Sequence, residues 1–150
     1  MLHKMSNEQM KDLDVAKNRL LEENRALVIV RNREVLFETR ASGIRGFLLA
    51  IERIGKGMAD SALADRIVGE AAAQLCVYSH VCEVYAVVLS QCGKNVLVKN
   101  HIHYEFESLV PHILNMKKTD LCPFEKIVAG SGTPEEAYRR LREKAAVSST

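Results

Sequence analysis

Apolar residues recur along this chain at two spacings, one typical of helices and one typical of strands. Where they return every three or four positions with charged residues between them, we expect helices. The helices are predicted over residues 5–23, 44–54, 67–78, 94–100, 123–129 and 137–146. The last two also carry start signals, namely Pro123 in a first helical position and a capping box over residues 133–136.

Shorter segments have the composition of strands. Residues 26–30 and 34–39 flank a turn at Arg31-Asn32-Arg33, and together they predict a hairpin. Residues 84–89 are apolar throughout, which is typical of a strand covered on both faces. Residues 102–106 alternate between apolar and polar, which indicates a strand with one polar face.

The order of these elements indicates an α/β fold. Strands and helices alternate late in the chain, so parallel strands joined by crossover helices are expected. We predict one domain over residues 1–150 with a three-layer α/β/α architecture, a mixed sheet and helices on both faces. Residues 60–65 are expected to form a connection or a short helical turn, and residues 110–114 another helical turn.

Composition narrows the class of protein but says nothing of its activity. The chain has 150 residues, 47% of them hydrophobic, which excludes an intrinsically disordered protein. Its net charge of +2 makes nucleic acid an unexpected partner. The longest apolar run, Val84 to Leu89, is far too short to span a membrane. The first residues lack an apolar segment typical of secretion, so we expect a cytoplasmic protein with four reduced cysteines.

Two histidines could bind a metal ion. His101 and His103 are two positions apart, so on a strand both would point to one face. A complete site would need a third ligand from elsewhere in the fold, and the candidates are His80, Cys82 and Cys122. The alternative is that the two histidines belong to the solvent face of an alternating strand.

A second candidate is the segment Leu121-Cys122-Pro123-Phe124-Glu125, which combines a thiol, a helix start and a carboxylate. Free backbone N–H groups at a helix start can bind an anion such as phosphate. The alternative is a purely structural cap. Asn115 either serves the same pocket or turns the chain.

Four segments carry a resemblance to a known family. They are Asp65-Arg66-Ile67-Val68-Gly69-Glu70-Ala71-Ala72-Ala73, Glu83-Val84-Tyr85-Ala86-Val87-Val88-Leu89-Ser90, residues 110–115 and residues 121–125. With the order of the elements, they resemble the cytidine deaminase-like superfamily. Within it, the chain looks similar to an uncharacterised bacterial family described as deaminases. The resemblance covers most of residues 20–130 and implies a cytidine deaminase-like sheet.

The resemblance also implies a position for the active site. Glu70 matches the proton-shuttling glutamate of zinc deaminases, and Cys92 matches the first cysteine of their zinc motif. Val68 stands where the histidine ligand would be, and Asn95 replaces the second cysteine. Two of three zinc ligands are therefore missing, while a catalytic zinc usually needs three from the protein. We accordingly expect no metal and no zinc-dependent deamination.

Three hypotheses of function follow. The first is a binding or sensor domain for a small polar molecule, a nucleoside or base by analogy, in a pocket lined by Val68, Gly69, Glu70, Cys92 and Asn95. The second is an active hydrolase or deaminase with an altered site. In it Glu70 is the general acid/base, and Cys92 is a metal ligand or nucleophile. The third is an oligomeric interaction protein without a small-molecule site. The resemblance also leads us to expect a homo-oligomer.

Overall fold

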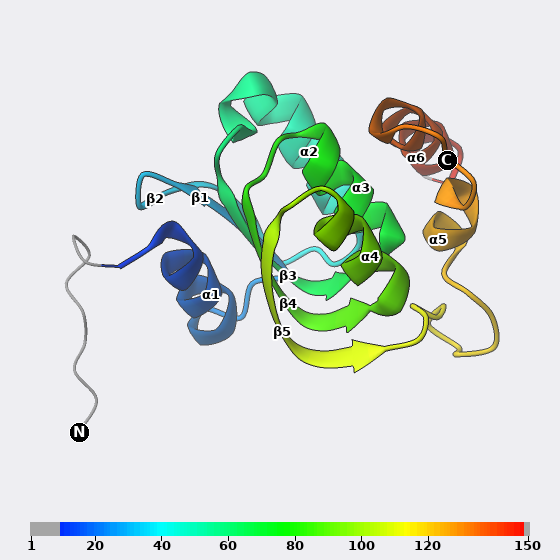
Figure 1. Ribbon diagram of the computed structural model, residues 1–150, viewed down its shortest axis with the longest axis horizontal. Helices are drawn as coiled ribbons and strands as arrows, with labels where there is room; N and C mark the ends of the chain where they lie inside the picture. The colour runs from blue at the N-terminus through cyan, green and yellow to red at the C-terminus, as the bar shows by residue number, and fades with distance from the viewer. Residues whose placement is uncertain (1–9, 149–150) are drawn as a thin grey trace.

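The computed structural model describes residues 10–148 and shows a five-stranded sheet surrounded by helices (Figure 1). The elements are α1 (Asp12–Glu22), β1 (Leu27–Arg31), β2 (Glu34–Thr39), α2 (Ile44–Ile54), a 3-10 helix η1 (Gly55–Met58), β3 (Ala62–Val68), α3 (Glu70–Tyr78), β4 (Glu83–Ser90), α4 (Gln91–Lys99), β5 (His103–Val110), α5 (Pro123–Val128) and α6 (Pro134–Ser148). The predicted α/β fold with a mixed sheet is confirmed.

The sheet has the strand order β2-β1-β3-β4-β5. Strand β1 runs antiparallel to both β2 and β3, whereas β3, β4 and β5 are parallel. The β1–β2 hairpin turns at Asn32 and Arg33, whose φ angles of 52° and 64° are those of a type I′ turn. Because α3 and α4 each connect two parallel strands, both helices begin at the same edge of the sheet.

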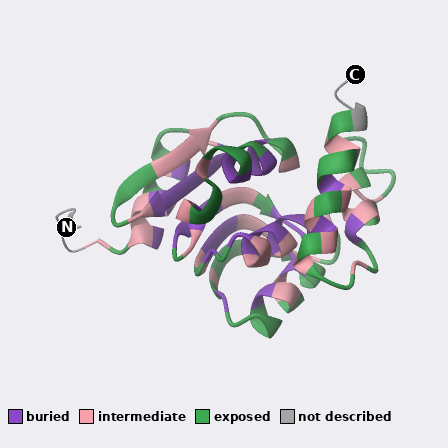
Figure 2. Ribbon diagram, turned by 90° about the horizontal axis from the view of Figure 1, so that it is seen from above, coloured by how far each residue is buried: buried purple, intermediate pink, exposed green. Residues whose placement is uncertain are grey.

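Helices cover the two faces of the sheet unequally. Of the helices in residues 10–148, only α1 lies on one face, where Leu13, Ala16 and Leu20 pack against β1, β3 and β4. Helices α2, α3 and α4 belong to the larger core on the other face, and α6 packs outside α3. Figure 2 shows the buried residues concentrated in the central strands and in the helix sides that face them. The larger core therefore lies beneath α3.

The central strand β3 is the main element that the sequence pattern missed. Residues 60–65 were expected to be a connection and the next helix to start near residue 67, yet 62–68 form a strand between β1 and β4. The segment did not look like a buried strand because it contains two charged residues, Asp65 and Arg66. The guanidinium of Arg66 donates to the backbone oxygens of Arg25 (2.9 Å) and Leu20 (2.8 Å), so its charge is accommodated by the tertiary structure. Consequently α3 begins only at Glu70.

Other boundaries differ by smaller amounts. The helical turn expected at 110–114 is absent, because β5 continues to Val110 and Leu114 then forms an isolated bridge with Leu121. Helix α4 begins at Gln91, where a turn was predicted, since the hydroxyl of Ser90 accepts the N–H of Gly93 at 3.0 Å. Helix α2 and the hairpin are confirmed. Residues 5–9 of the first predicted helix lie outside the described residues.

Candidate functional site

The starts of α3 and α4 meet at the carboxyl ends of β3 and β4, and we call this region the α3–α4 edge. Strands β3 and β4 are parallel neighbours, and each leads directly into its helix. Contact between the two helix starts depends on Gly93, because a Cβ there would lie 2.9 Å from the Val68 carbonyl oxygen. The fold therefore brings Val68, Gly69, Glu70 and Cys92 into one region. Whether they bind a ligand stays a prediction.

A carboxylate that is distant in the sequence completes this edge. Helix α3 has glycine as its N-cap, so no side chain of its own cap satisfies its first N–H groups. The carboxylate of Glu125 accepts the N–H of Glu70 and the N–H of Ala71, both at 2.8 Å. The fit requires glycine at position 69, since a Cβ there would lie 2.1 Å from Glu125 Oε1. Glu125 thus caps α3 from α5.

This arrangement changes the interpretation of the segment 121–125. The sequence suggested that the start of its helix could receive an anion or was a structural cap. In the structure Glu125 is itself the anion, and the helix start that it caps is that of α3. Cys122 precedes Pro123 as the N-cap residue of α5, and its N–H donates to the Ile113 oxygen at 2.9 Å. Asn115 closes a turn by accepting the N–H of Thr119 at 3.0 Å.

Burial perturbs both carboxyl groups at the edge. It raises the pKa of Glu70 above its ordinary value, and the neighbouring Glu125 carboxylate raises this pKa further. Burial also raises the pKa of Glu125, although its two backbone hydrogen bonds act in the opposite direction. Each carboxyl group therefore holds a proton more readily than in water. Such a pair can accept hydrogen bonds from a ligand or move a proton to and from it.

The remaining predicted residues differ in what they offer. The Val68 side chain is fully buried in the core, so only its backbone faces the edge. Cys92 is an exposed free thiol in the first turn of α4. Asn95 is exposed one turn later, and its Oδ1 accepts the amide of Gln91 at 2.9 Å. Sequence reasoning did not assign Glu125 to this edge, although the missing side-chain cap at Gly69 was a signal that an acceptor must come from elsewhere.

The histidines do not form the expected pair. His101 precedes β5 with a φ of 57°, and only His103 lies on the strand, where its ring contacts the Glu105 carboxylate at 3.3 Å. In residues 10–148, no three His, Cys, Asp or Glu side chains are grouped so that they could hold a metal ion. Cys82 donates its thiol to the Ser61 oxygen at 3.3 Å. Over the same part of the chain, no helix is long and apolar enough to cross a membrane.

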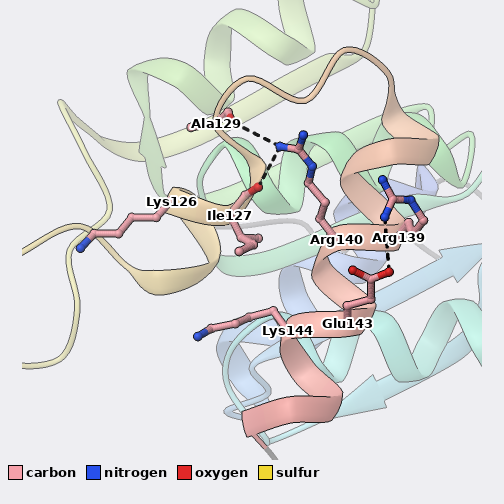
Figure 3. Close-up of a pocket in the computed structure, with 7 residues that line it drawn as sticks. All are labelled: Lys126, Ile127, Ala129, Arg139, Arg140, Glu143 and Lys144. Carbon is pink, nitrogen blue, oxygen red and sulfur yellow. Dashed lines mark hydrogen bonds and ion pairs between the residues drawn. The ribbon is translucent and has the colours of Figure 1, made fainter.

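A basic pocket of about 600 Å³ lies between α5 and α6 (Figure 3). Its cationic side chains are engaged with the protein itself. Arg140 donates to the Glu136 carboxylate at 2.7 Å and reaches the backbone oxygens of Ile127 and Ala129. Arg139 pairs with Glu143 at 3.3 Å, and Lys126 pairs with Asp120. We therefore interpret this pocket as part of the packing interface between α5 and α6, and not as a ligand site.

Comparison with known proteins places the chain in a family. A sequence model of the TM1506 family, described as a domain of unknown function (DUF1893), matches residues 15–145, and the chain therefore belongs to this family. The fold is similar to the crystal structure of a DUF1893 family protein (TM1506) from Thermotoga maritima. The TM-score is 0.81 and the identity 23%, over 95% of this chain and 97% of that one. At this identity the likeness shows the fold alone. No curated protein matches the chain.

These findings correct the resemblance drawn from the sequence. The assignment to the cytidine deaminase-like superfamily and its deaminase family is wrong, because the matching family is a different one and no cytidine deaminase is among the matches. Two of the segments that carried the resemblance, residues 65–73 and 83–90, consist largely of packing positions, whereas residues 110–115 and 121–125 are exposed or half-buried. Val68, Gly69 and Leu89, for example, are all buried. Such residues report how strands lead into helices and carry no information about the reaction.

Proposed function

We propose that this protein is a binding or sensor domain for a small polar molecule, with its site at the α3–α4 edge. The observation that supports this proposal is the position of Glu125. Its carboxylate is held by two N–H groups of α3 beside Glu70, so two carboxyl groups meet next to the start of α4. Burying charge in this way costs stability, which favours a role in binding over a purely structural one.

The chemistry of the edge limits the ligand. Glu125 occupies the first N–H groups of α3, so an anion gains little there. The Glu70 carboxyl group remains as an acceptor, and it lies beside the first turn of α4, where N–H groups have no acceptor within the helix. The ligand that fits best carries a hydrogen-bond donor, such as an amine or amide, together with an acceptor. A nucleoside or base is no longer favoured, because that expectation rested on the corrected resemblance, as did the homo-oligomer.

The test is a thermal-shift screen of small amines, amides and ureas on the full chain and on Glu70→Gln. A ligand present at about 100 times its Kd stabilises a protein by roughly 2.7 kcal/mol, which raises Tm by about 5–10 °C at this size. We expect such a shift for the unmodified chain and a much smaller one for Glu70→Gln. Glu34→Gln, on the distant β1–β2 hairpin, is the matched control. Equal shifts in all three proteins would exclude Glu70 from the site, and no shift with any compound would contradict the proposal.

A hydrolase is the second candidate, and the raised pKa of Glu70 beside Glu125 favours it. A carboxyl group whose pKa is raised toward neutrality is suited to general acid–base work. In this candidate Glu70 moves a proton, and the exposed thiol of Cys92 is the nucleophile. The geometry supports it less well, because within residues 10–148 no hydrogen bond joins a base to the thiol, and a nucleophilic cysteine needs such a base. Turnover retained in full by Glu70→Gln and by Cys92→Ser would rule it out.

A further inference from the structure

A second pocket lies at the other end of α3, far along the helix from Glu125. It has a volume of about 740 Å³ and is formed where α2 and α3 end and α6 begins. Figure 1 shows α6 beside α2 and α3, and all three helices are in contact with one another. We call it the α2–α3–α6 pocket. Its volume is that of a typical small-molecule site.

The carboxyl ends of two helices add negative potential to this pocket. The last turn of α2 contributes Glu52 and Gly55 to the lining, and the end of α3 contributes Tyr78 and Ser79. Each helix carries the equivalent of about half a negative charge at its carboxyl end. The carboxyl ends of α2 and α3 meet at this pocket, and the amino end of α6, which is also there, carries the opposite partial charge. A cation placed between the two carboxyl ends is attracted by both.

Two carboxylates strengthen the negative potential. Glu52 projects from α2, and Glu135 projects from the first turn of α6 on another wall of the pocket. Within residues 10–148 neither carboxylate has a hydrogen bond or an ion pair, and both are exposed. The pocket between α5 and α6 differs, since Lys126, Arg139 and Arg140 are paired there. The charges of the α2–α3–α6 pocket are available to a ligand.

An aromatic wall gives the pocket a fixed shape. The rings of Tyr78 and Tyr138 stack with their centroids 4.1 Å apart and their planes 15° from parallel. The guanidinium of Arg142 lies 5.4 Å from the centroid of the Tyr138 ring. This stack joins α3 to α6. Both tyrosines are only partly buried, so their edges and hydroxyl groups reach the lining.

Lys56 is the cation that the protein itself brings to the pocket. It belongs to η1, directly after α2, and it is exposed and without an ion pair in the described part of the chain. Its ammonium group can therefore swing toward or away from the carboxylates. A lysine in this position competes with an external cation for the same potential.

From these observations we propose that the α2–α3–α6 pocket binds a small organic cation, an ammonium or guanidinium compound. Glu52 and Glu135 are its two acceptors and the Tyr78–Tyr138 stack is its wall. This site is separate from the α3–α4 edge and does not depend on the function proposed for that edge.

The test compares butane-1,4-diamine with butane-1,4-diol, which has the same length and no charge. Each is titrated into the full chain at pH 7 while backbone amide resonances are followed by NMR. We expect the diamine to shift the amides of Gly55, Ser79 and His80 with a saturable curve in the millimolar range, and the diol to leave them unchanged. The proposal is overturned if both compounds act alike, or if the diamine shifts acidic surface residues throughout the molecule without saturation.

Variants then assign the acceptors. The double variant Glu52→Gln, Glu135→Gln keeps the shape of two exposed side chains, so it is expected to fold, and it should weaken the diamine about tenfold. Lys56→Met removes the internal competitor and should tighten binding about threefold. Glu34→Gln, outside the pocket and outside the α3–α4 edge, should leave the affinity unchanged. Unaltered binding in the double variant would refute the assignment, and loss of binding in Glu70→Gln would place the diamine at the α3–α4 edge instead.

Discussion

The two ends of α3 differ in how the protein satisfies them. The amino end is occupied by the protein itself, because Glu125 reaches in from α5 and accepts two N–H groups. The carboxyl end faces an open pocket whose carboxylates, Glu52 and Glu135, have no partner in residues 10–148. A charge that is already paired fixes the fold, whereas an unpaired charge remains available to a ligand. Substitutions at the two ends of α3 should therefore have different effects.

The largest effect is expected from Gly69→Ala. The new Cβ would lie 2.1 Å from Glu125 Oε1 and 2.8 Å from Ile113 Cγ1, so Glu125 must leave its position. Overpacking together with loss of the cap should lower the free energy of unfolding by about 3 kcal/mol in urea denaturation. Gly132→Ala is the control, since its Cβ would have ordinary contact at 3.6 Å from Glu136. Similar stability of both variants would show that the amino end of α3 is not tightly packed.

The second-largest effect is the dependence of stability on pH, which comes mainly from Asp65 in strand β3. Burial raises the pKa of Asp65 to about 7, and burial also raises the pKa values of Glu70 and Glu125. A carboxyl group whose pKa is raised on folding binds its proton more tightly in the folded state. Its stabilising effect is therefore complete below the unfolded pKa, near 4, and is lost as pH rises toward 7.

We accordingly expect the free energy of unfolding to fall by about 2 kcal/mol between pH 5 and pH 8, a figure below the full linkage value because Asp65 retains some contact with solvent. Asp65→Asn should remove most of this decline. Below pH 4 the trend reverses, because ion pairs with Arg19 and Arg25 lower the pKa of Glu38 and that stabilisation is lost on protonation. Chemical denaturation at several pH values measures both limbs. A flat profile from pH 5 to 8 would contradict the prediction.

A smaller effect is expected from Glu125→Ala. It leaves the N–H groups of Glu70 and Ala71 without their acceptor, which should cost about 1.5 kcal/mol of unfolding free energy. The matched change at the other end, Glu135→Ala, removes an unpaired exposed carboxylate and should cost less than about 0.5 kcal/mol. If both variants lose the same stability, the two ends of α3 do not differ as described.

The smallest effect on stability is expected from Cys92→Ser, because this thiol is exposed at the start of α4. The thiol of Cys92, at the α3–α4 edge, should nevertheless react faster than the thiol of Cys76 in the core. Cys76 is a fully buried residue of α3, and burial raises the pKa of its thiol well above the ordinary value. An alkylating reagent should therefore modify Cys92 in the folded protein and Cys76 only after unfolding, as followed by mass spectrometry. Equal rates at the two cysteines would show that the core opens readily.

The sequence predicted elements best where local signals were complete. Helix α2 has apolar residues on one face and glycines at its end, and its bounds were predicted as 44–54, as found. The capping box at the start of α6 was also predicted, and in the structure the Thr133 hydroxyl accepts the N–H of Glu136 at 3.1 Å. Its reciprocal bond differs in detail, because the Glu136 carboxylate accepts from Gly132. Strand β3 failed as a prediction because Arg66 is accommodated by the backbone oxygens of Leu20 and Arg25, which are distant in the sequence, while Asp65 accepts the N–H of Ile67.

The positions of the candidate site residues also depended on contacts between segments that are distant in the sequence. Glu70 and Cys92 were placed together only through the resemblance, because strand β3, which leads α3 to the same edge as α4, was not predicted. Glu125 was not assigned to this edge, because it is 55 residues from the N–H group that it caps. The α2–α3–α6 pocket was also not predicted, since its walls come from three helices and only their packing decides that Glu52 and Glu135 face one space.

Local patterns in the sequence were sufficient to predict the class of fold, because apolar periodicity and turn residues act over a few positions. They did not locate the starts of α3 and α4, which were predicted at residues 67 and 94 and are found at Glu70 and Gln91. Which charges are paired and which remain open depended on the tertiary structure. The reason is physical: hydrogen bonds and ion pairs depend on distances of about 3 Å between groups that the chain brings together from any separation. Helix α3 therefore has an amino end that Glu125 caps and a carboxyl end that faces an open pocket, and the elements packed around it cause this difference.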